Sequence, residues 1–405
     1  DLPSQGVAQH LYAKALAIED AHGQRSVLVA VDMLGFTRDL AQRVARRARD
    51  DYQLPRDALL LNSSHTHAGP VIGRMFATGY LNMRQKNWDA VDDYTRVLED
   101  KIVQVIGNAI VNLSPANLDF GRTRAGFAVN RRIKTPTGYR GAFHNWEGPV
   151  DHDVPVLRVT SPSGKIRGIV FGYACHNTAI RPEVMKFHGG WSGTAQHELE
   201  ARYPGAVALF IAGCGGDINP YPFGSQELAE IHGRALAGMV RIALGRPLRP
   251  LTGPLRVRYE EFPIRFQKPK SREEFERISR QDHPYRRIHA KKMLAILDRD
   301  GELPKTCPYP LQVWSFGSEL TLIAMGGEVV VDYVLRLNRE LDADKIWVAG
   351  FSNDVLGYIP SARILAEGGA EAEAETIYYD LPAPFAPSIE ETIVAKVHQW
   401  IAQTQ

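Results

Sequence analysis

The chain has 405 residues, of which 44% are hydrophobic and 23% charged, with a formal net charge of +2. This ordinary globular composition supports a large core, and the small net charge does not favour a nucleic-acid partner. No apolar run is long enough to span a bilayer, so no membrane span is expected. The three cysteines do not describe a disulfide framework, although one bridge between Cys175 and Cys214 stays open.

Apolar patterns predict strands and helices along the whole chain, without an internal repeat or a clean linker. A single α/β domain spanning residues 1–405 is therefore expected. The acidic stretch 366–376 is expected to be a mobile loop, and the basic stretch 271–298 a solvated helical face. Strands are predicted at 11–17, 26–33, 59–61, 116–128, 154–160, 167–174, 207–212, 255–266, 311–316, 320–325 and 346–350. Helices are predicted at 37–51, 87–112, 191–203, 225–243, 271–298 and 388–403, with another that ends near 341.

Two histidines, His65 and His67, follow the predicted strand at 59–61, just before Gly69-Pro70. Side chains two residues apart on extended chain project to the same side. The pair therefore suits a metal site in which one imidazole binds the ion and the other lies beside it. Taken alone, the stretch fits a strand end with two solvated histidines equally well.

Several other apolar strands also end in small residues and one polar group. In α/β sheets, sites form beyond the carboxyl ends of strands. Histidine and carboxylate are ligand types that zinc accepts, and bound zinc activates water for hydrolysis. The sequence therefore predicts a mononuclear hydrolytic metal site if these ends meet. The strand ends carry His65 and His67, His176, Asp217, Glu328 and Tyr358. His188, which precedes two glycines, is a further candidate for the pocket lining.

Seven motifs, in order, resemble the N-terminal catalytic domain of the neutral/alkaline (non-lysosomal) ceramidases, from about residue 7 to about residue 378. A set of seven in one order is much more specific than any single motif. The motifs are Ser64-His65-Thr66-His67-Ala68-Gly69-Pro70, Asn130-Arg131-Arg132, Gly148-Pro149-Val150-Asp151 leading to Val154-Pro155-Val156-Leu157, Ala174-Cys175-His176, Gly216-Asp217-Ile218-Asn219-Pro220, Gly327-Glu328, and Ser352-Asn353-Asp354 to Tyr358.

The resemblance implies a zinc amidohydrolase that cuts the N-acyl bond of ceramide, with mixed β-sheets flanked by helices. It implies Zn²⁺ as the cofactor, with His67 moving a proton beside the metal and Arg131 contacting the substrate. The implied metal ligands are His65, His176, Glu328 and Tyr358. Tyr358 is chosen from the resemblance alone, because tyrosine is a rare zinc ligand.

The chain also departs from the family pattern. Asn219 stands where the ceramidases carry a catalytic serine, and Gly190 stands where they carry an aspartate. An amide is no nucleophile, but Asn219 can donate a hydrogen bond to an oxyanion, and Asp217 of the same motif is the third catalytic candidate. We also expect a member of the family that lacks the C-terminal immunoglobulin-like domain and the first N-terminal strand. We expect a short bacterial ceramidase-like protein, secreted or periplasmic after signal-peptide removal, with the cytoplasm as the alternative.

Three functions are left open. The first is hydrolysis of an N-acyl amide bond, and the second is hydrolysis of a soluble carbohydrate, ester or lactone at the same site. In the second, aromatic residues such as Trp191 would bind the substrate, although core packing is favoured for them; the others are Tyr173, Tyr221 and Phe223. The third is a non-catalytic metal-binding protein. The expected partner is a small-molecule, lipid or glycan substrate, and the oligomeric state is left open.

Overall fold

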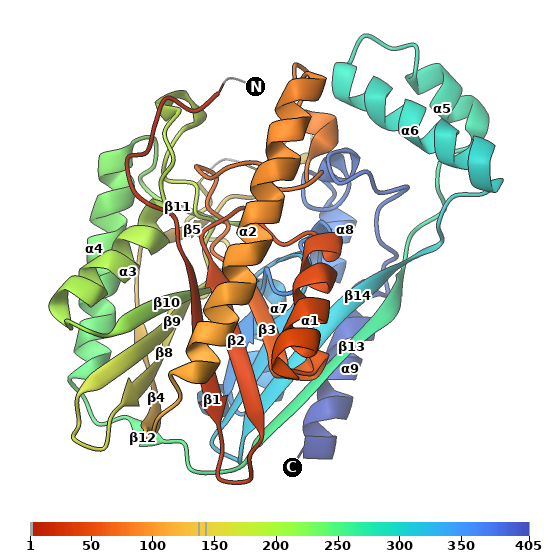
Figure 1. Cartoon of the computed structure of the whole chain (residues 1–405). Coiled ribbons are helices and arrows are strands. Elements are labelled where there is room, and N and C mark those ends of the chain that lie inside the picture. Colours follow the sequence, from red (N-terminus) through yellow and green to blue (C-terminus); the bar gives the residue numbers. More distant parts are fainter. Residues whose placement is uncertain (1–2, 137, 142–143, 405) are drawn as a thin grey trace.

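Three β-sheets wrapped by helices make up the computed structural model, which describes residues 3–136, 138–141 and 144–404 (Figure 1). The first sheet joins β1 (Ala13–Glu19), β2 (Arg25–Val31) and β3 (Leu59–Ser63). The second has the order β10 (Val207–Ala212), β9 (Ile166–Tyr173), β8 (Asp153–Thr160), β4 (Asn117–Arg124) and β12 (Arg249–Pro250). The third has the order β13 (Leu255–Arg265), β14 (Thr306–Phe316), β15 (Leu320–Met325) and β17 (Ile346–Ala349). Parallel pairs β2–β3, β9–β10 and β15–β17 occur beside antiparallel ones, so the predicted α/β fold with mixed sheets is confirmed.

Each of these sheets turns one face to a shared apolar core and the other to helices. Strand β2 shows the reason, because alternate side chains of a strand point to opposite faces. Leu28 enters the shared core, whereas Val27 and Val29 pack with the helices. The shared core includes Leu28, Leu60, Leu157, Val170, Leu209, Trp314, Leu322 and Trp347.

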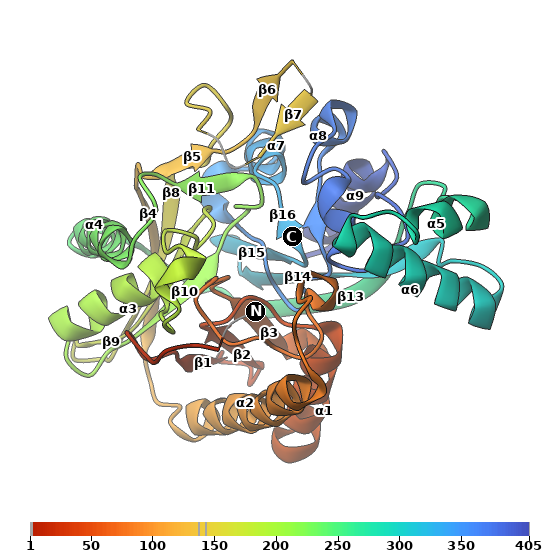
Figure 2. The same cartoon turned by 90° about the horizontal axis from the view of Figure 1, so that it is seen from above.

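The helices lie outside the sheets, as the view from above shows (Figure 2). Helices α1 (Arg38–Tyr52) and α2 (Gln85–Val111) cover the first sheet, α3 (Gly190–Arg202) and α4 (Gln226–Leu244) the second, and α7 (Asp332–Glu340) and α9 (Ile389–Thr404) the third. The short 3-10 helices are Arg56–Ala58, Ala77–Gly79, Pro182–Val184, Ala343–Lys345 and Ala374–Ile377. No described helix meets the length and apolarity needed to cross a membrane.

Short strand pairs complete the side of the molecule that carries the strand ends. They are β5 (Ala128–Asn130) with β11 (Ile218–Pro220), β6 (Ile133–Thr135) with β7 (Gly138–Arg140), and β16 (Glu328–Val329) with β18 (Tyr358–Ile359).

The predicted helix at 271–298 is wrong in one respect, because two helices occupy it. Helix α5 (Arg272–Ile278) ends before His283, which caps α6 (Pro284–Asp300). Proline has no N–H and favours the first position of a helix, so Pro284 starts a new helix rather than continuing the old one. The two helices pack on a small core of their own and extend away from the main body (Figure 1).

The sequence predicted a mobile loop at 366–376, but the structure ties this segment to the body at Glu371. Its carboxylate is buried and forms ion pairs with Arg131 and Arg132. The segment continues from α8 (Ala362–Glu367) and is held against the body by these charges. The acidic composition predicted a mobile loop because a sequence does not show which carboxylate pairs with a buried arginine.

The buried Asn62 joins the carboxyl ends of strands from all three sheets. Its Nδ2 donates to the Gly350 carbonyl oxygen at 2.8 Å, just past β17, and its Oδ1 accepts from the Ala212 amide of β10 at 2.9 Å. Asn62 itself lies on β3. These hydrogen bonds hold the ends of β3, β10 and β17 together. The metal site predicted from the sequence required that strand ends meet in this way. Cys175 and Cys214 are both buried free thiols.

Candidate metal centre

His65 and His176 face each other just beyond β3 and β9, with ring centroids 4.8 Å apart. Nδ1 of His65 lies 2.6 Å from the Leu34 carbonyl oxygen, and Nδ1 of His176 lies 2.6 Å from that of Gly215. A carbonyl oxygen only accepts, so each Nδ1 carries the hydrogen and each Nε2 presents a lone pair. Backbone carbonyls orient metal-binding histidines in this way.

The backbone at His65 is unusual, with a φ of 53°. Non-glycine residues in this left-handed region are uncommon and persist only when their surroundings hold them. The ring of Phe351, which also has a positive φ, packs on His65 at 4.4 Å between centroids. Phe351 follows β17, so a second sheet helps to fix the first imidazole.

Glu328 supplies a carboxylate to the two imidazoles. Its Oε2 lies 2.9 Å from Nε2 of His176 and 3.4 Å from Nε2 of His65. Burial raises the pKa of this carboxyl, but His65 and His176 more than offset burial and hold the pKa well below its ordinary value. The carboxylate is therefore charged and directed at the nitrogen lone pairs.

Tyr358 stands beside Glu328 because β16 and β18 pair in parallel with these two residues as partners. Its Oη lies 3.5 Å from Nε2 of His176 and accepts a hydrogen bond from Nη2 of Arg131 at 3.0 Å. Burial raises the pKa of the phenol well above its ordinary value, while Arg131 acts in the opposite direction. The four side chains for which the sequence predicted metal binding thus come together.

Tyr379 is a fifth member of the group and was missed by the sequence analysis. Its phenol donates to Oε1 of Glu328, and burial followed by the Glu328 charge raises its pKa well above the ordinary value. The phenol therefore remains a hydrogen-bond donor. Tyr379 belongs to no predicted strand end and no quoted motif, so no local signal singled it out.

His67 lies at the edge of the group, with Nε2 3.1 Å from Nε2 of His65. Its side chain is exposed and lines a groove of about 880 Å³. The groove continues over mainly apolar side chains, among them Tyr80, Met83, Val91, Tyr94, Ile180 and Phe187.

The donor atoms fit a small divalent metal ion. Ligands about 2.0–2.1 Å from a tetrahedral zinc lie about 3.3 Å from one another. The separations from Glu328 Oε2 to the two imidazoles, 2.9 and 3.4 Å, are close to that value. A second set is also compatible, because the ligand nitrogens of His65, His67 and His176 all lie within 4.8 Å of one another.

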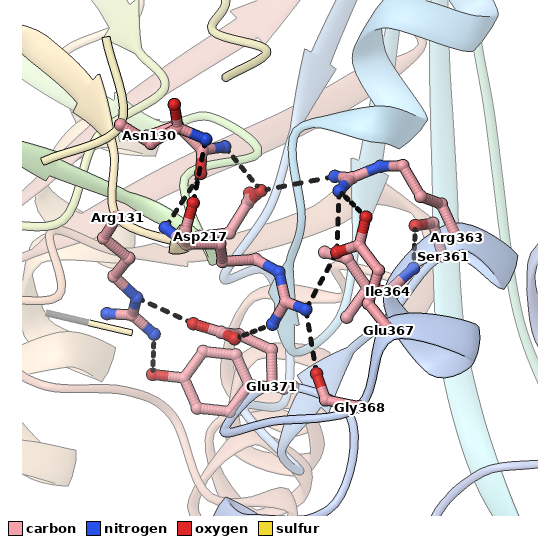
Figure 3. Close-up of polar contacts among 12 residues, drawn as sticks. Asn130, Arg131, Asp217, Ser361, Arg363, Ile364, Glu367, Gly368 and Glu371 are labelled. Atoms are coloured by element: carbon pink, nitrogen blue, oxygen red, sulfur yellow. Dashed lines mark hydrogen bonds and ion pairs between the residues drawn. The ribbon is translucent and has the colours of Figure 1, made fainter. Parts of the chain in front are cut away.

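Arg131 extends the site towards Asn219, the second catalytic candidate. Nη1 of Arg131 donates to Oδ1 of Asn219 at 3.5 Å, and Nε donates to Oε1 of Glu371 at 2.9 Å, so Arg131 faces Glu371 in Figure 3. Asn219 also accepts from Thr178 at 3.5 Å. The predicted substrate contact, Arg131, therefore lies between Tyr358 and Asn219.

Asp217, predicted to be catalytic, lies behind the site. It is fully buried, and its carboxylate accepts from Asn130 Nδ2 at 3.0 Å (Figure 3). The carboxylate also accepts from the Val331 amide at 2.8 Å. Burial raises its pKa to about 6. Asp217 thus joins β5 to the segment before α7, and its catalytic role stays a prediction.

Trp191 and His188, the other two predicted substrate contacts, are both buried, and their contact with a substrate stays a prediction. The Trp191 ring is fully buried, and its Nε1 donates to the His176 carbonyl oxygen at 2.9 Å. His188 is buried at the start of α3, where its Nδ1 accepts the Gly190 amide at 2.8 Å. Gly190 has a φ of 67°, and a Cβ there would lie 1.9 Å from Oδ1 of Asn177. An aspartate at 190 therefore does not fit unless Asn177 moves.

Comparisons with known proteins point to one family. The model of the neutral/alkaline non-lysosomal ceramidase N-terminal region matches residues 2–226, more than half of the chain. Neutral ceramidase A of Dictyostelium discoideum is 25% identical over 228 residues, which are 51% of this chain and 30% of that protein. The chain thus matches less than a third of that curated relative's length.

Solved structures share the fold over a longer span. A ceramidase described as complexed with C2 is 18% identical, with a TM-score of 0.74 over 96% of this chain and 68% of that one. Neutral ceramidase from Pseudomonas aeruginosa is also 18% identical, with a TM-score of 0.71 over the same shares. Glu328 and Tyr358 lie outside the matched 2–226 region, and at such low identity the solved structures support the shared fold alone there.

Proposed function

The chain belongs to the neutral/alkaline non-lysosomal ceramidase family, a family of hydrolases, and from this premise we propose that it is a zinc-dependent hydrolase that cleaves an N-acyl amide bond. One observation carries the proposal. The Nε2 atoms of His65 and His176 converge on Glu328 Oε2 while a backbone carbonyl holds each Nδ1. Buried, preoriented donors of this kind are what a catalytic zinc requires.

In this proposal His65, His176, Glu328 and Tyr358 hold the ion. The burial of the two histidines and of Glu328 supports this set over the one that includes His67, whose imidazole is exposed to the groove. When bound, zinc supplies Lewis acidity and activates water for attack on a carbonyl carbon. Tyr379 holds Glu328 in the orientation that presents Oε2 to the imidazoles.

His67 moves the proton. Its Nε2 faces the centre from the groove side, so it can accept a proton from the attacking water and return it to the leaving nitrogen. Arg131 and Asn219 position the substrate and donate hydrogen bonds to the carbonyl oxygen as charge develops on it. The contact of Arg131 with Tyr358 supports this role, because it brings the guanidinium beside the proposed ligands.

The groove that begins at His67 supports a lipid amide as substrate. Its volume of about 880 Å³ and its apolar side chains suit a hydrocarbon chain whose amide end reaches the histidines. A hydrocarbon chain gains about 0.8 kcal/mol for each buried CH₂ group. A soluble ester or carbohydrate substrate is the second candidate, favoured by exposed aromatic residues on the Asn219 side of the site.

The test pairs metal analysis with catalysis. His65→Ala and Glu328→Ala are compared with His22→Ala, which changes an exposed histidine, for bound zinc and for fatty-acid release from an N-acylsphingosine. We expect the first two variants to fold, to lose zinc and to lose activity, while His22→Ala keeps both. A folded His65→Ala or Glu328→Ala protein that retains full activity contradicts the proposed site.

A further inference from the structure

Four ring side chains gather near Asn219: His144, Trp146, Tyr221 and Phe223, called the rim cluster below. The His144 centroid lies 4.2 Å from that of Tyr221 and 5.7 Å from that of Phe223. The rings of Trp146 and Tyr221 lie 5.0 Å apart and meet at 87°. Trp146 is 66% exposed and Tyr221 is 38% exposed, so a ring face remains open to solvent.

The rim cluster is built onto the paired strands β5 and β11. Asn145 is anchored on β5, because its amide donates to the Asn130 carbonyl oxygen and its Nδ2 donates to that of Arg132, both at 2.8 Å. Tyr221 follows directly after β11, and its amide donates to the Phe127 carbonyl oxygen at 2.8 Å. Both sides of the cluster are thus held by backbone contacts rather than by the rings alone.

The rim cluster is continuous with the proposed site. Tyr221 lies two residues after Asn219, whose side chain contacts Arg131, and Arg131 contacts Tyr358. The apolar groove, in contrast, begins at His67. A substrate with its chain in the groove and its scissile amide at the histidines therefore has the rim cluster available to its polar end.

We propose that the rim cluster is a subsite for a sugar ring carried by the polar end of the substrate, an inference that rests on the proposed function. The carbon-bound hydrogens on a pyranose face are weakly positive, and an aromatic face is negative, so the exposed Trp146 ring suits stacking. Hydroxyl groups at the sugar edge require hydrogen-bond partners. The indole N–H, the Tyr221 hydroxyl and the His144 imidazole offer donors and acceptors.

A bilayer surface is the competing occupant, because tryptophan and tyrosine also favour membrane interfaces. The neighbouring Glu147 is exposed and charged, which disfavours insertion into lipid and favours hydroxyl groups. The Trp146 and Tyr221 rings also meet at 87°, so they do not form one flat apolar surface. These features favour a sugar ring over a bilayer surface as the occupant of the rim cluster.

Tryptophan fluorescence tests the proposal without requiring catalysis. Trp146 is exposed, whereas Trp191, Trp314, Trp347 and Trp400 are buried and Trp88 is half-buried. Methyl β-glucoside and methyl β-galactoside are titrated to about 50 mM, which detects a millimolar Kd. We expect a saturable emission change that is absent in Trp146→Ala and present in Tyr12→Ala, which removes an exposed ring elsewhere. No change with either sugar, or a response only to phosphatidylcholine vesicles, overturns the proposal.

A kinetic comparison uses the same variants with glucosylceramide and with unglycosylated ceramide. In Trp146→Ala we expect kcat/KM to fall about tenfold further for the glycosylated substrate than for the other, as loss of one aromatic stacking contact implies. An equal fall for both substrates overturns the subsite. If the wild-type protein hydrolyses neither, the proposed function fails, and the fluorescence titration still decides whether the rim cluster binds a sugar.

Discussion

Tyr379 donates a hydrogen bond to Oε1 of Glu328, while Oε2 of the same carboxylate lies 2.9 Å from Nε2 of His176. The two carboxylate oxygens thus have separate partners. One is held by a phenol from the segment after α8, and the other is presented to the imidazoles. The orientation of the proposed ligand is therefore set by a residue about fifty positions later in the chain.

Replacing Tyr379 by Phe removes this hydrogen bond but keeps the ring that packs on Phe76 at 4.5 Å between centroids. We expect zinc affinity to fall about tenfold to a hundredfold, as is usual when a partner of a metal ligand is lost. Competition with a zinc chelator measures the affinity. Tyr378→Phe is the matched control, and equal affinities in the two variants would show that Tyr379 does not orient Glu328.

His67→Ala separates the two candidate ligand sets. If His67 moves a proton and does not bind the ion, the variant should retain its zinc while kcat falls about 10²-fold to 10⁴-fold. His65→Ala, in contrast, should lose zinc. Zinc content and steady-state rates check both variants, and a loss of zinc from His67→Ala as severe as from His65→Ala would favour the three-histidine set.

Glu371→Gln should destabilise the folded chain strongly. The side chain of Glu371 is 0% exposed and faces Arg131 and Arg132, which are 12% and 2% exposed. The substitution therefore removes the carboxylate partner of Arg131 and leaves Arg132 with Glu367 alone. Breaking a buried ion pair in this way costs about 3–5 kcal/mol of unfolding free energy. Urea denaturation measures the loss.

The control for Glu371→Gln is Glu373→Gln, two residues along on the exposed side of the same segment. It should change the unfolding free energy by no more than about 0.5 kcal/mol. If the two variants have the same stability, the segment 366–376 is not held by the Glu371 ion pairs.

Asp354 should make stability fall as pH rises. Burial raises the pKa of its carboxyl from 3.8 to about 7, with Arg38 acting in the opposite direction. Between pH 3.8 and about 7 the folded state binds more protons than the unfolded state. The contribution of Asp354 to the free energy of unfolding is therefore greatest below about pH 4 and is lost as the pH passes 7. The full change is at most about 4 kcal/mol.

The measurement is the difference in unfolding free energy between wild type and Asp354→Asn at several pH values. The wild-type protein should lose stability relative to the variant from pH 4 to pH 7.5 or so, because only the wild type must ionise a buried carboxyl. A difference that stays constant over this range would contradict the raised pKa.

Particular residues show how much could be inferred from the sequence. The strand before His65 and the strand before His176 were predicted because buried parallel strands appear as short apolar runs. The family, with the set His65, His176, Glu328 and Tyr358, was recognised from local motifs, and these side chains do lie together. The metal and the roles of these residues stay predictions.

The positions of other residues could not be inferred, because they depend on contacts between segments far apart in the chain. Trp191 begins the predicted helix at 191–203, and Asp217 lies in one of the quoted motifs. Trp191 packs in the core, and Asp217 hydrogen-bonds behind the site. Glu371 lies in the predicted mobile loop and Tyr379 in no quoted motif, yet each contacts a proposed site residue.

The amino-acid sequence alone determined which residues form strands and which polar side chains lie at the strand ends. Both follow from residue spacing and apolarity, which are local properties of the chain. Only the tertiary structure decided which of those strand ends lie together at the proposed metal site. Hydrogen bonds such as those of Asn62 join strands from separate sheets, and burial then selects which carboxylate meets an imidazole and which meets an arginine. Such pairings depend on distances in space that no spacing along the sequence records.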